Sequence, residues 1–148
     1  MEDARSIAQD FLDCQGEATI SGDLEATLGW CNLPCTLESS QGRTVATTEA
    51  EMRAICTMFI DNVKAKRLTH MVRRCIEAMF NDDDTICAAY ETRYIRDGHQ
   101  LAEDPYTGFV ILRRDHDRWK ISNMQFAVDN DSPVEVTLRD WARVKVNN

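Results

Sequence analysis

The stretch that decides the fold is RLTHMVRRCIEAMFNDDDTICAAYETRYI, residues 67–95. It contains two runs with strand periodicity, near 68–80 and 85–96, on either side of an acidic turn. A connection this short permits only an antiparallel hairpin, because a parallel crossover needs a dozen or more residues. Two more runs, near 106–114 and 119–128, follow further turn signals. The second half of the chain is therefore predicted to be a meander of long antiparallel strands.

Upstream of this stretch the period of the apolar residues changes to that of a helix. Apolar residues over 3–20 lie on one helical face, and Asp23 is a predicted N-cap for a second, shorter helix that ends before Pro34. Residues 35–39 and 43–47 flank a polar turn and are typical of two short strands or an extended loop. The first half of the chain is thus predicted to be mainly helical.

The clearest helix signal is a capping box made by Thr48 and Glu51. One apolar stripe follows it: Met52, Ile55, Cys56, Phe59, Ile60 and Val63. The expected fold class is α+β, a cone-shaped barrel in which three N-terminal helices pack on a curved antiparallel sheet. Residues 1–148 are expected to form a single domain, and 129–148 to be a C-terminal tail that docks on the sheet or on a second subunit.

The length and net charge of the chain limit the classes of function that it can have. A chain of 148 residues has the common size of one domain. Its net charge of -8 makes nucleic acid an unfavourable partner, and the lack of a long apolar run predicts a cytoplasmic protein without membrane spans.

Six cysteines without an export signal are expected to be reduced thiols. Cys31 and Cys35 lack a second ligand pair at zinc-site spacing, so we expect neither a metal nor another cofactor.

Three segments together resemble the nuclear-transport-factor-2-like superfamily. They are GDLEATLGW (22–30), the deciding stretch 67–95, and GFVILRRDHDRWKISNMQFAV (108–128). The chain is most similar to the SnoaL-like branch, which includes polyketide cyclases, ketosteroid isomerases, scytalone dehydratase and the small subunits of ring-hydroxylating dioxygenases. The resemblance implies a pocket between the helices and the sheet, for an apolar or aromatic small molecule.

The resemblance also suggests catalytic residues. Thr69-His70-Met71-Val72 is similar to the first long strand of scytalone dehydratase, in which a histidine at this place acts on the substrate. Glu38 aligns with the catalytic carboxylate of ketosteroid isomerases. However, Ile20 stands where dehydratases have an aspartate, the strand from Tyr106 has no second histidine, and Val110 or Ile111 replaces an isomerase acid.

Alternation along 68–80 gives the orientation of each side chain. The more apolar set is expected to face inward: Leu68, His70, Val72, Arg74, Ile76, Ala78 and Phe80. His70 is then either an acid/base or ligand contact, or a core histidine with satisfied hydrogen bonds. Arg74 either holds an acidic ligand, pairs with Glu38 or Glu91, or is exposed at the surface because a β-bulge turns it outward.

Further candidates come from acid/base chemistry and from aromatic side chains. Glu38 is either a general base in an apolar hollow or a solvated residue of an edge strand. Tyr90, on one face with Tyr94, is a candidate hydrogen-bond partner of a ligand carbonyl, or simply a core residue. Trp30 and Trp119 are expected to line the pocket or a subunit contact.

Two functions therefore stay open. One is a cofactor-free isomerase, dehydratase or cyclase in which His70 and Glu38 move protons. The other is a non-catalytic ligand-binding module, or a small subunit that stabilises a larger oxygenase-type partner. In both cases we expect a homodimer or homo-oligomer.

Overall fold

The structure is a computed structural model that describes residues 3–128 and 131–146. The elements in chain order are α1 (Ala4–Ile20), α2 (Leu24–Gly29), β1 (Cys31–Ser39), β2 (Gly42–Ala46), α3 (Glu49–Ala65), β3 (Leu68–Asp82), β4 (Thr85–Arg96), β5 (Gln100–Leu101), β6 (Tyr106–Asp115), β7 (Arg118–Phe126) and α4 (Pro133–Val146).

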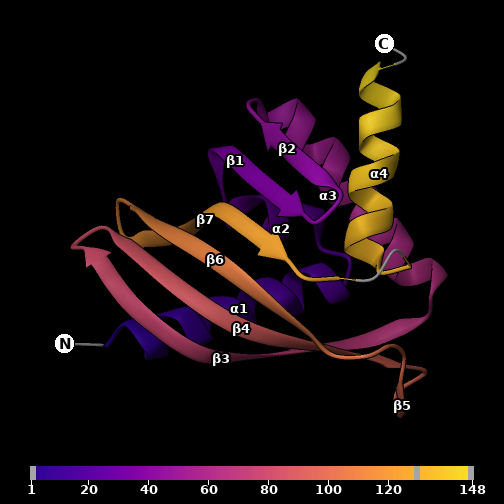
Figure 1. Cartoon of the computed structure of the whole chain (residues 1–148), viewed down its shortest axis with the longest axis horizontal. Helices are drawn as coiled ribbons and strands as arrows, with labels where there is room; N and C mark the ends of the chain where they lie inside the picture. The colour runs from indigo at the N-terminus through magenta and orange to yellow at the C-terminus, as the bar shows by residue number, and fades with distance from the viewer. Residues whose placement is uncertain (1–2, 129–130, 147–148) are drawn as a thin grey trace.

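The strands form one curved, unclosed sheet in the order β2-β1-β7-β6-β4-β3, with β5 paired to β4 (Figure 1). The four long strands β3, β4, β6 and β7 pair antiparallel with their neighbours, as the sequence predicts. The sheet is mixed, however, because β1 pairs with β7 in parallel. The predicted α+β architecture, with helices against a curved sheet, is confirmed.

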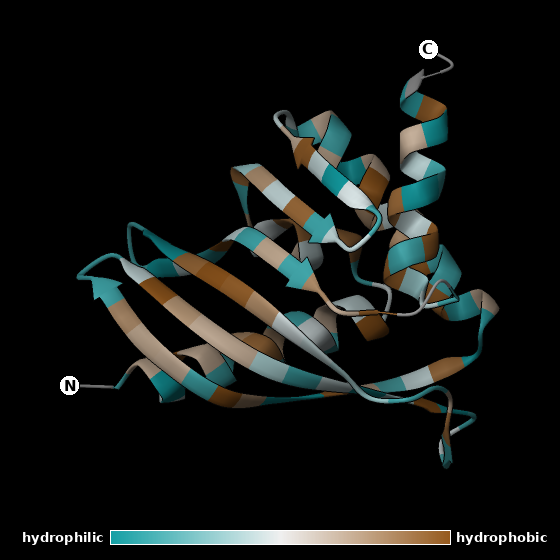
Figure 2. Ribbon diagram, in the orientation of Figure 1, coloured by the Kyte–Doolittle hydropathy of each residue, from teal (hydrophilic) through white to brown (hydrophobic). Residues whose placement is uncertain are grey.

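The helices pack against the inner side of the sheet. Helix α1 runs beneath β3 and β4, and α3 lies beside α4 at one end of the molecule (Figure 1). Hydrophobic and hydrophilic residues follow one another along these helices (Figure 2), as expected where only one face is buried. Their buried residues, such as Phe11, Leu12 and Ile55, join Ile86 and Leu112 of the sheet in the main core.

Strand β3 does not keep the alternation that the sequence suggests. Its pairing with β4 shifts between Leu68 and His70, so that Thr69 and His70 are both exposed. The alternation is thereby reversed, and Arg73 and Cys75 become buried. A second shift, between Cys75 and Glu77, restores it. The predicted inward face is therefore wrong for His70, Val72, Arg74 and Ile76, which are exposed, and Phe80 is exposed as well.

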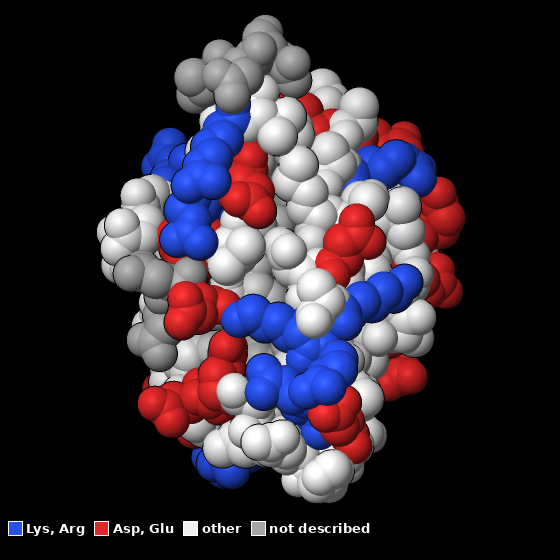
Figure 3. Space-filling model, turned by 90° about the vertical axis from the view of Figure 1, so that its right-hand side faces the viewer, with Lys and Arg blue, Asp and Glu red and all other residues white. Residues whose placement is uncertain are grey.

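The C-terminal segment is a helix that docks within the chain. Helix α4 packs on α3, where the Nδ2 amide of Asn62 donates a hydrogen bond to Thr137 Oγ1 at 2.9 Å. Residues 129–130 and 147–148 of the predicted tail lie outside the described residues. Figure 3 shows the end of the molecule at which α4 lies, where basic and acidic side chains are interspersed.

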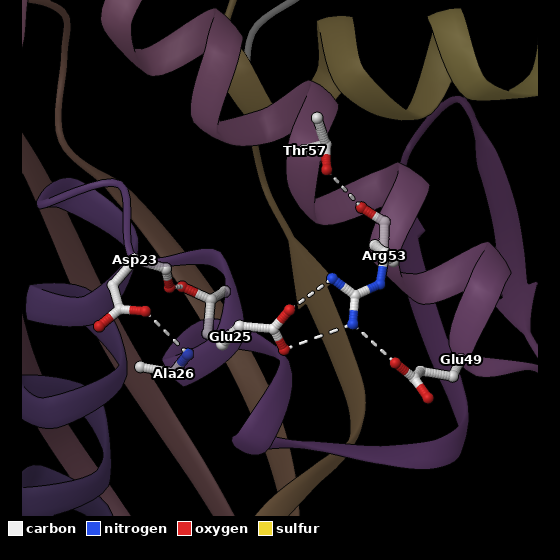
Figure 4. Close-up of polar contacts among 7 residues, drawn as sticks. Asp23, Glu25, Ala26, Glu49, Arg53 and Thr57 are labelled. Atoms are coloured by element: carbon white, nitrogen blue, oxygen red, sulfur yellow. Dashed lines mark hydrogen bonds and ion pairs between the residues drawn. The ribbon is translucent and has the colours of Figure 1, made fainter.

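Ion pairs and caps on the surface fix the positions of α2 and α3. Arg53 of α3 bridges Glu25 of α2 and Glu49, with N to O distances of 2.6 and 2.7 Å (Figure 4). The N-cap Thr48 of α3 accepts a hydrogen bond from the Glu51 backbone N–H at 3.1 Å, as the capping box predicts. The return bond differs, since the Glu51 carboxylate accepts from the backbone N–H of Thr47.

The outer face of the sheet bears exposed apolar side chains. Met79 of β3 is 60% exposed and Phe109 of β6 is 36% exposed. The sequence predicts a homodimer and a larger oxygenase-type partner. Either contact would need an exposed apolar face of this kind, and both remain predictions. Among the described helices, none is long and apolar enough to span a membrane.

We predict that Gly108→Ala destabilises the protein. A Cβ at this buried position of β6 would lie 2.4 Å from Cζ of the Tyr90 ring, which is itself fully buried. Such overpacking costs about 1 to 3 kcal/mol of unfolding free energy, measurable by urea denaturation. Thr107→Ala, at the exposed neighbouring position, serves as the control and should change stability by less than about 0.5 kcal/mol. Equal stability of the two variants would contradict the packing described.

A second prediction concerns acid stability. Hydrogen bonds from Thr47 and Lys145 lower the pKa of Glu51 from 4.5 to about 2. Its carboxylate therefore stabilises the fold fully above pH 4.5, and this contribution is lost as the pH falls from 4.5 toward 2, because the unfolded state binds the proton first. In urea denaturation, Glu51→Gln should be less stable than the wild type at pH 7, and the difference should shrink toward pH 2. A difference independent of pH would show that the carboxylate charge is not involved.

Candidate functional site

An interior cavity of about 80 Å³ lies between the helices and the inner side of the sheet. Most of its lining is apolar and comes from β1, α3, β7 and α4. The aliphatic, thioether and phenylalanine side chains are Leu37, Met52, Ile55, Phe59, Met71, Ile121, Met124, Phe126, Val134 and Leu138. Such a volume exceeds the space needed by one water molecule, and an apolar wall holds water poorly. The cavity is therefore suited to a small apolar group.

Among the described residues that line this cavity, Arg73 is the one with a charged side chain. Its Nη2 donates hydrogen bonds to the backbone carbonyl of Leu12, at 2.8 Å, and to Oε1 of Gln15, both on α1. Gly16 of the same helix provides the space for it, since a Cβ there would lie 3.2 Å from Nη2. The guanidinium also lies over the Tyr90 ring, with Cζ 5.9 Å from the ring centroid. Helix α1 and Tyr90 thus hold Arg73 from two sides.

The charge of Arg73 is not neutralised within the described part of the chain. Arg73 is only 7% exposed, and no described carboxylate lies within 4.0 Å of its nitrogens. Its Nε is buried without a hydrogen-bond partner. A buried charge without its partner costs about 3 to 5 kcal/mol. Such an arrangement is rare in a core that has only a structural role.

Two tyrosines add hydroxyl groups to the same wall. The hydroxyls of Tyr94 and Tyr106 lie 3.2 Å apart and share a hydrogen bond. Burial raises the pKa of both side chains, so both remain protonated at neutral pH. One of the two protons is used in the hydrogen bond between them, so the pair has one proton left to donate, and neither tyrosine can serve as a base.

Three cysteines approach the cavity from β1 and α3. Cys31, Cys35 and Cys56 are free thiols that line it. A hydrogen bond from the Cys56 thiol lowers the pKa of Cys31, whereas burial raises that of Cys35. Although thiolates are ligands of soft metals, no group of three metal-binding side chains within residues 3–128 and 131–146 is placed to hold an ion.

The predicted acid/base residues lie elsewhere. His70 is exposed, with its Nδ1 2.9 Å from the Thr69 hydroxyl, and Arg74 is exposed on the other face of β3 from Arg73. Glu38 is half-buried in β1 and lines a shallow surface groove with Phe109 and Gln125. The structure brings none of these three into the cavity. The expectation that His70 points into the pocket is therefore wrong.

The predicted aromatic residues have mixed outcomes. Tyr90 and Tyr94 share the inner face of β4 as predicted, but Tyr90 packs beside Arg73 and is not among the residues lining the cavity. Trp30 and Trp119 line a separate surface groove at the other end of α1, where Trp30 packs against Phe11 at 5.3 Å. They are therefore not part of the interior site.

The chemistry open to the cavity follows from its lining. Its described lining residues include a guanidinium, hydroxyls, thiols and the Gln15 amide, but no carboxylate and no imidazole. These groups can bind and orient a ligand, whereas proton abstraction from carbon needs a base with a suitable pKa. Sequence reasoning missed Arg73 and Tyr106. The signal for Arg73 was present in the adjacent pair Arg73-Arg74, of which alternation must bury one.

Comparisons with solved structures identify the fold. An NTF-2-like protein of unknown function from Shewanella oneidensis is 18% identical, with a TM-score of 0.62 over 83% of this chain and 98% of that one. A domain of unknown function with a cystatin-like fold from Nostoc punctiforme is 15% identical, with a TM-score of 0.66 over 96% of this chain and 91% of that one.

A third similar structure is a candidate aromatic ring hydroxylase from Novosphingobium aromaticivorans. It is 17% identical, with a TM-score of 0.56 over 84% of this chain and 87% of that one. No protein-family model and no curated protein sequence matches the chain. The likenesses show the fold alone, and they confirm the expected nuclear-transport-factor-2-like architecture.

The thiol arrangement yields a prediction about reactivity. Because the lowered pKa of Cys31 depends on the hydrogen bond from Cys56, Cys56→Ala should shift the alkylation of Cys31 to higher pH. The rate of iodoacetamide labelling of each cysteine, measured by peptide mass spectrometry against pH, checks this. Cys87→Ala is the control, since Cys87 is not among the residues lining the cavity. An unchanged Cys31 profile in Cys56→Ala would contradict the thiol contact.

Proposed function

We propose that this protein, which has the nuclear-transport-factor-2-like fold, binds a small and largely apolar molecule in its interior cavity without changing it chemically. The observation behind this proposal is the lining of the cavity, in which apolar side chains from several elements surround a small number of polar groups. Binding sites for small molecules usually combine a mostly apolar wall with a few convergent polar groups.

The lining favours binding over acid/base catalysis. An isomerase, dehydratase or cyclase of the cofactor-free type needs a group that accepts a proton at neutral pH. His70 and Glu38, the two residues predicted for that role, both lie outside the cavity. The cavity tyrosines stay protonated, so that they supply hydrogen bonds to a ligand rather than a base. Of the two functions left open by the sequence, the non-catalytic ligand-binding module agrees better with this geometry.

A binding function also accounts for the position of α4. This helix contributes Val134, Thr137 and Leu138 to the wall, and Thr137 is fixed by its hydrogen bond from Asn62 of α3. Docking of α4 therefore encloses one side of the cavity. Exclusion of water there strengthens both the apolar and the polar contacts that a ligand would make.

The direct test uses ethylbenzene, a neutral probe of suitable size, and measures protein stability. At a free concentration of ten times its Kd, ethylbenzene should raise the unfolding free energy by about 1.4 kcal/mol. Leu138→Phe, which places a larger ring in the cavity, should abolish this stabilisation. Val144→Phe is the matched control, because Val144 lies on the same helix but is 39% exposed.

If ethylbenzene stabilised neither the wild type nor Val144→Phe, the proposed binding function would be contradicted. Equal stabilisation of Leu138→Phe and Val144→Phe would likewise place the binding site outside the cavity. NMR shifts of the Ile55 and Met52 methyl groups give an independent location for the bound probe.

A further inference from the structure

The feature that the proposed function leaves unexplained is the uncompensated charge of Arg73. Arg73 is only 7% exposed. A cavity wall that only had to exclude water would not need a buried guanidinium. The surrounding protein holds this side chain in place without neutralising it, through backbone and amide acceptors on α1 and the face of Tyr90. These partners are dipoles and the face of an aromatic ring, and none of them carries the negative charge that would balance the guanidinium.

The unused donors of Arg73 define what is missing. A guanidinium has five N–H groups. The two on Nη2 bond to Leu12 and Gln15, while Nε is buried without a partner and Nη1 makes no hydrogen bond with any described residue. Gln15 is itself fixed, since its Nε2 donates to the Thr19 hydroxyl at 3.3 Å. Nε and Nη2 form the edge that faces α1, where a Cβ at Gly16 would lie 3.5 Å from Nε and 3.2 Å from Nη2, so the donors left for a ligand are those of Nη1.

We infer that the ligand is a monocarboxylic acid with a small aromatic or aliphatic body, whose carboxylate pairs with Arg73. A carboxylate oxygen can accept a charge-assisted hydrogen bond from Nη1, and the pairing would replace an unpaired buried charge with a compensated ion pair. One hydroxyl proton of the Tyr94–Tyr106 pair is used in the hydrogen bond between them, and the other remains to donate to an anionic end on the same wall. This inference rests on the proposed binding function and adds the charge of the ligand to it.

The chain offers a matched control for this inference. Arg74 is the next residue of β3, with the same side chain and formal charge, but it is exposed on the opposite face of the sheet. Neutralising either residue changes the net charge of the protein by the same amount. Any difference between Arg73→Met and Arg74→Met therefore reports the interior position and not the overall electrostatic field.

The experiment compares phenylacetate, phenylacetamide and acetate by isothermal titration calorimetry at pH 7. The wild type and Arg74→Met should bind phenylacetate at least tenfold more tightly than phenylacetamide, which has nearly the same shape without the charge. Acetate, which has the charge without the apolar body, should bind at least tenfold more weakly than phenylacetate. Arg73→Met should lose the preference for the acid, so that phenylacetate binds no better than phenylacetamide.

Thermal unfolding without ligand distinguishes a binding role from a structural one. Arg73→Met should be at least as stable as the wild type, because methionine removes an unpaired charge from the interior. If Arg73→Met fails to fold, Arg73→Lys decides the question. It keeps the charge but has a single nitrogen, which cannot both bond to Leu12 and Gln15 and face a ligand, so it should bind phenylacetate at least tenfold more weakly than the wild type.

The two proposals fail in different ways. If ethylbenzene binds in the cavity but the wild type does not prefer phenylacetate over phenylacetamide, the carboxylate inference is wrong and the binding function stands. An acid preference that survives in Arg73→Met, or acetate binding as tight as that of phenylacetate, would also overturn the inference. If ethylbenzene stabilises neither the wild type nor Val144→Phe, the binding function itself is wrong.

Discussion

The pairing register of β3 is the constraint on which the interior of this protein depends. The first two of the three irregularities in its ladder with β4 each place two consecutive residues on the outside, first Thr69 and His70 and later Ile76 and Glu77. Between them the strand turns Arg73 and Cys75 inward. Helix α1 contacts the strand at this point, where the Arg73 guanidinium bonds to Leu12 and Gln15 and lies against Gly16. One strand therefore sets both where α1 contacts the sheet and which charged side chain reaches the described lining of the cavity.

Much of the architecture could be predicted from the sequence because it depends on local periodicity and on turn chemistry. The capping box at Thr48, the helical spacing upstream and the acidic turn after Phe80 placed α1, α3 and the long strands within a few residues of their observed ends. The parallel pairing of β1 with β7 could not be predicted in this way, since it joins segments far apart in the chain. The C-terminal residues gave a correct signal of burial, but their partner, α3, is a tertiary property.

The candidate site was predicted less well than the fold, and the reason is physical. Strand periodicity assigns a face only as long as the strand remains regular, and a shift of one residue moves every later side chain to the other side. The prediction for β3 started correctly at Leu68, which is buried, and failed at the first irregularity. His70 and Arg74 were placed inside for that reason, whereas Arg73 was assigned to the surface. In β4, which has no such break over Thr85–Tyr94, the predicted inward face of Tyr90 and Tyr94 is confirmed.

The central claim is that Arg73, and not Arg74, is enclosed in the interior with its Nε–H group shielded from water. Exchange of the arginine Nε–H protons with solvent, measured by NMR on labelled protein without ligand, tests this claim most directly. We expect a separate Arg73 signal whose exchange is at least tenfold slower than that of Arg74, because the interior must open before water can reach it. Equal exchange rates for the two arginines, or slower exchange for Arg74, would contradict the register of β3 and the site built on it.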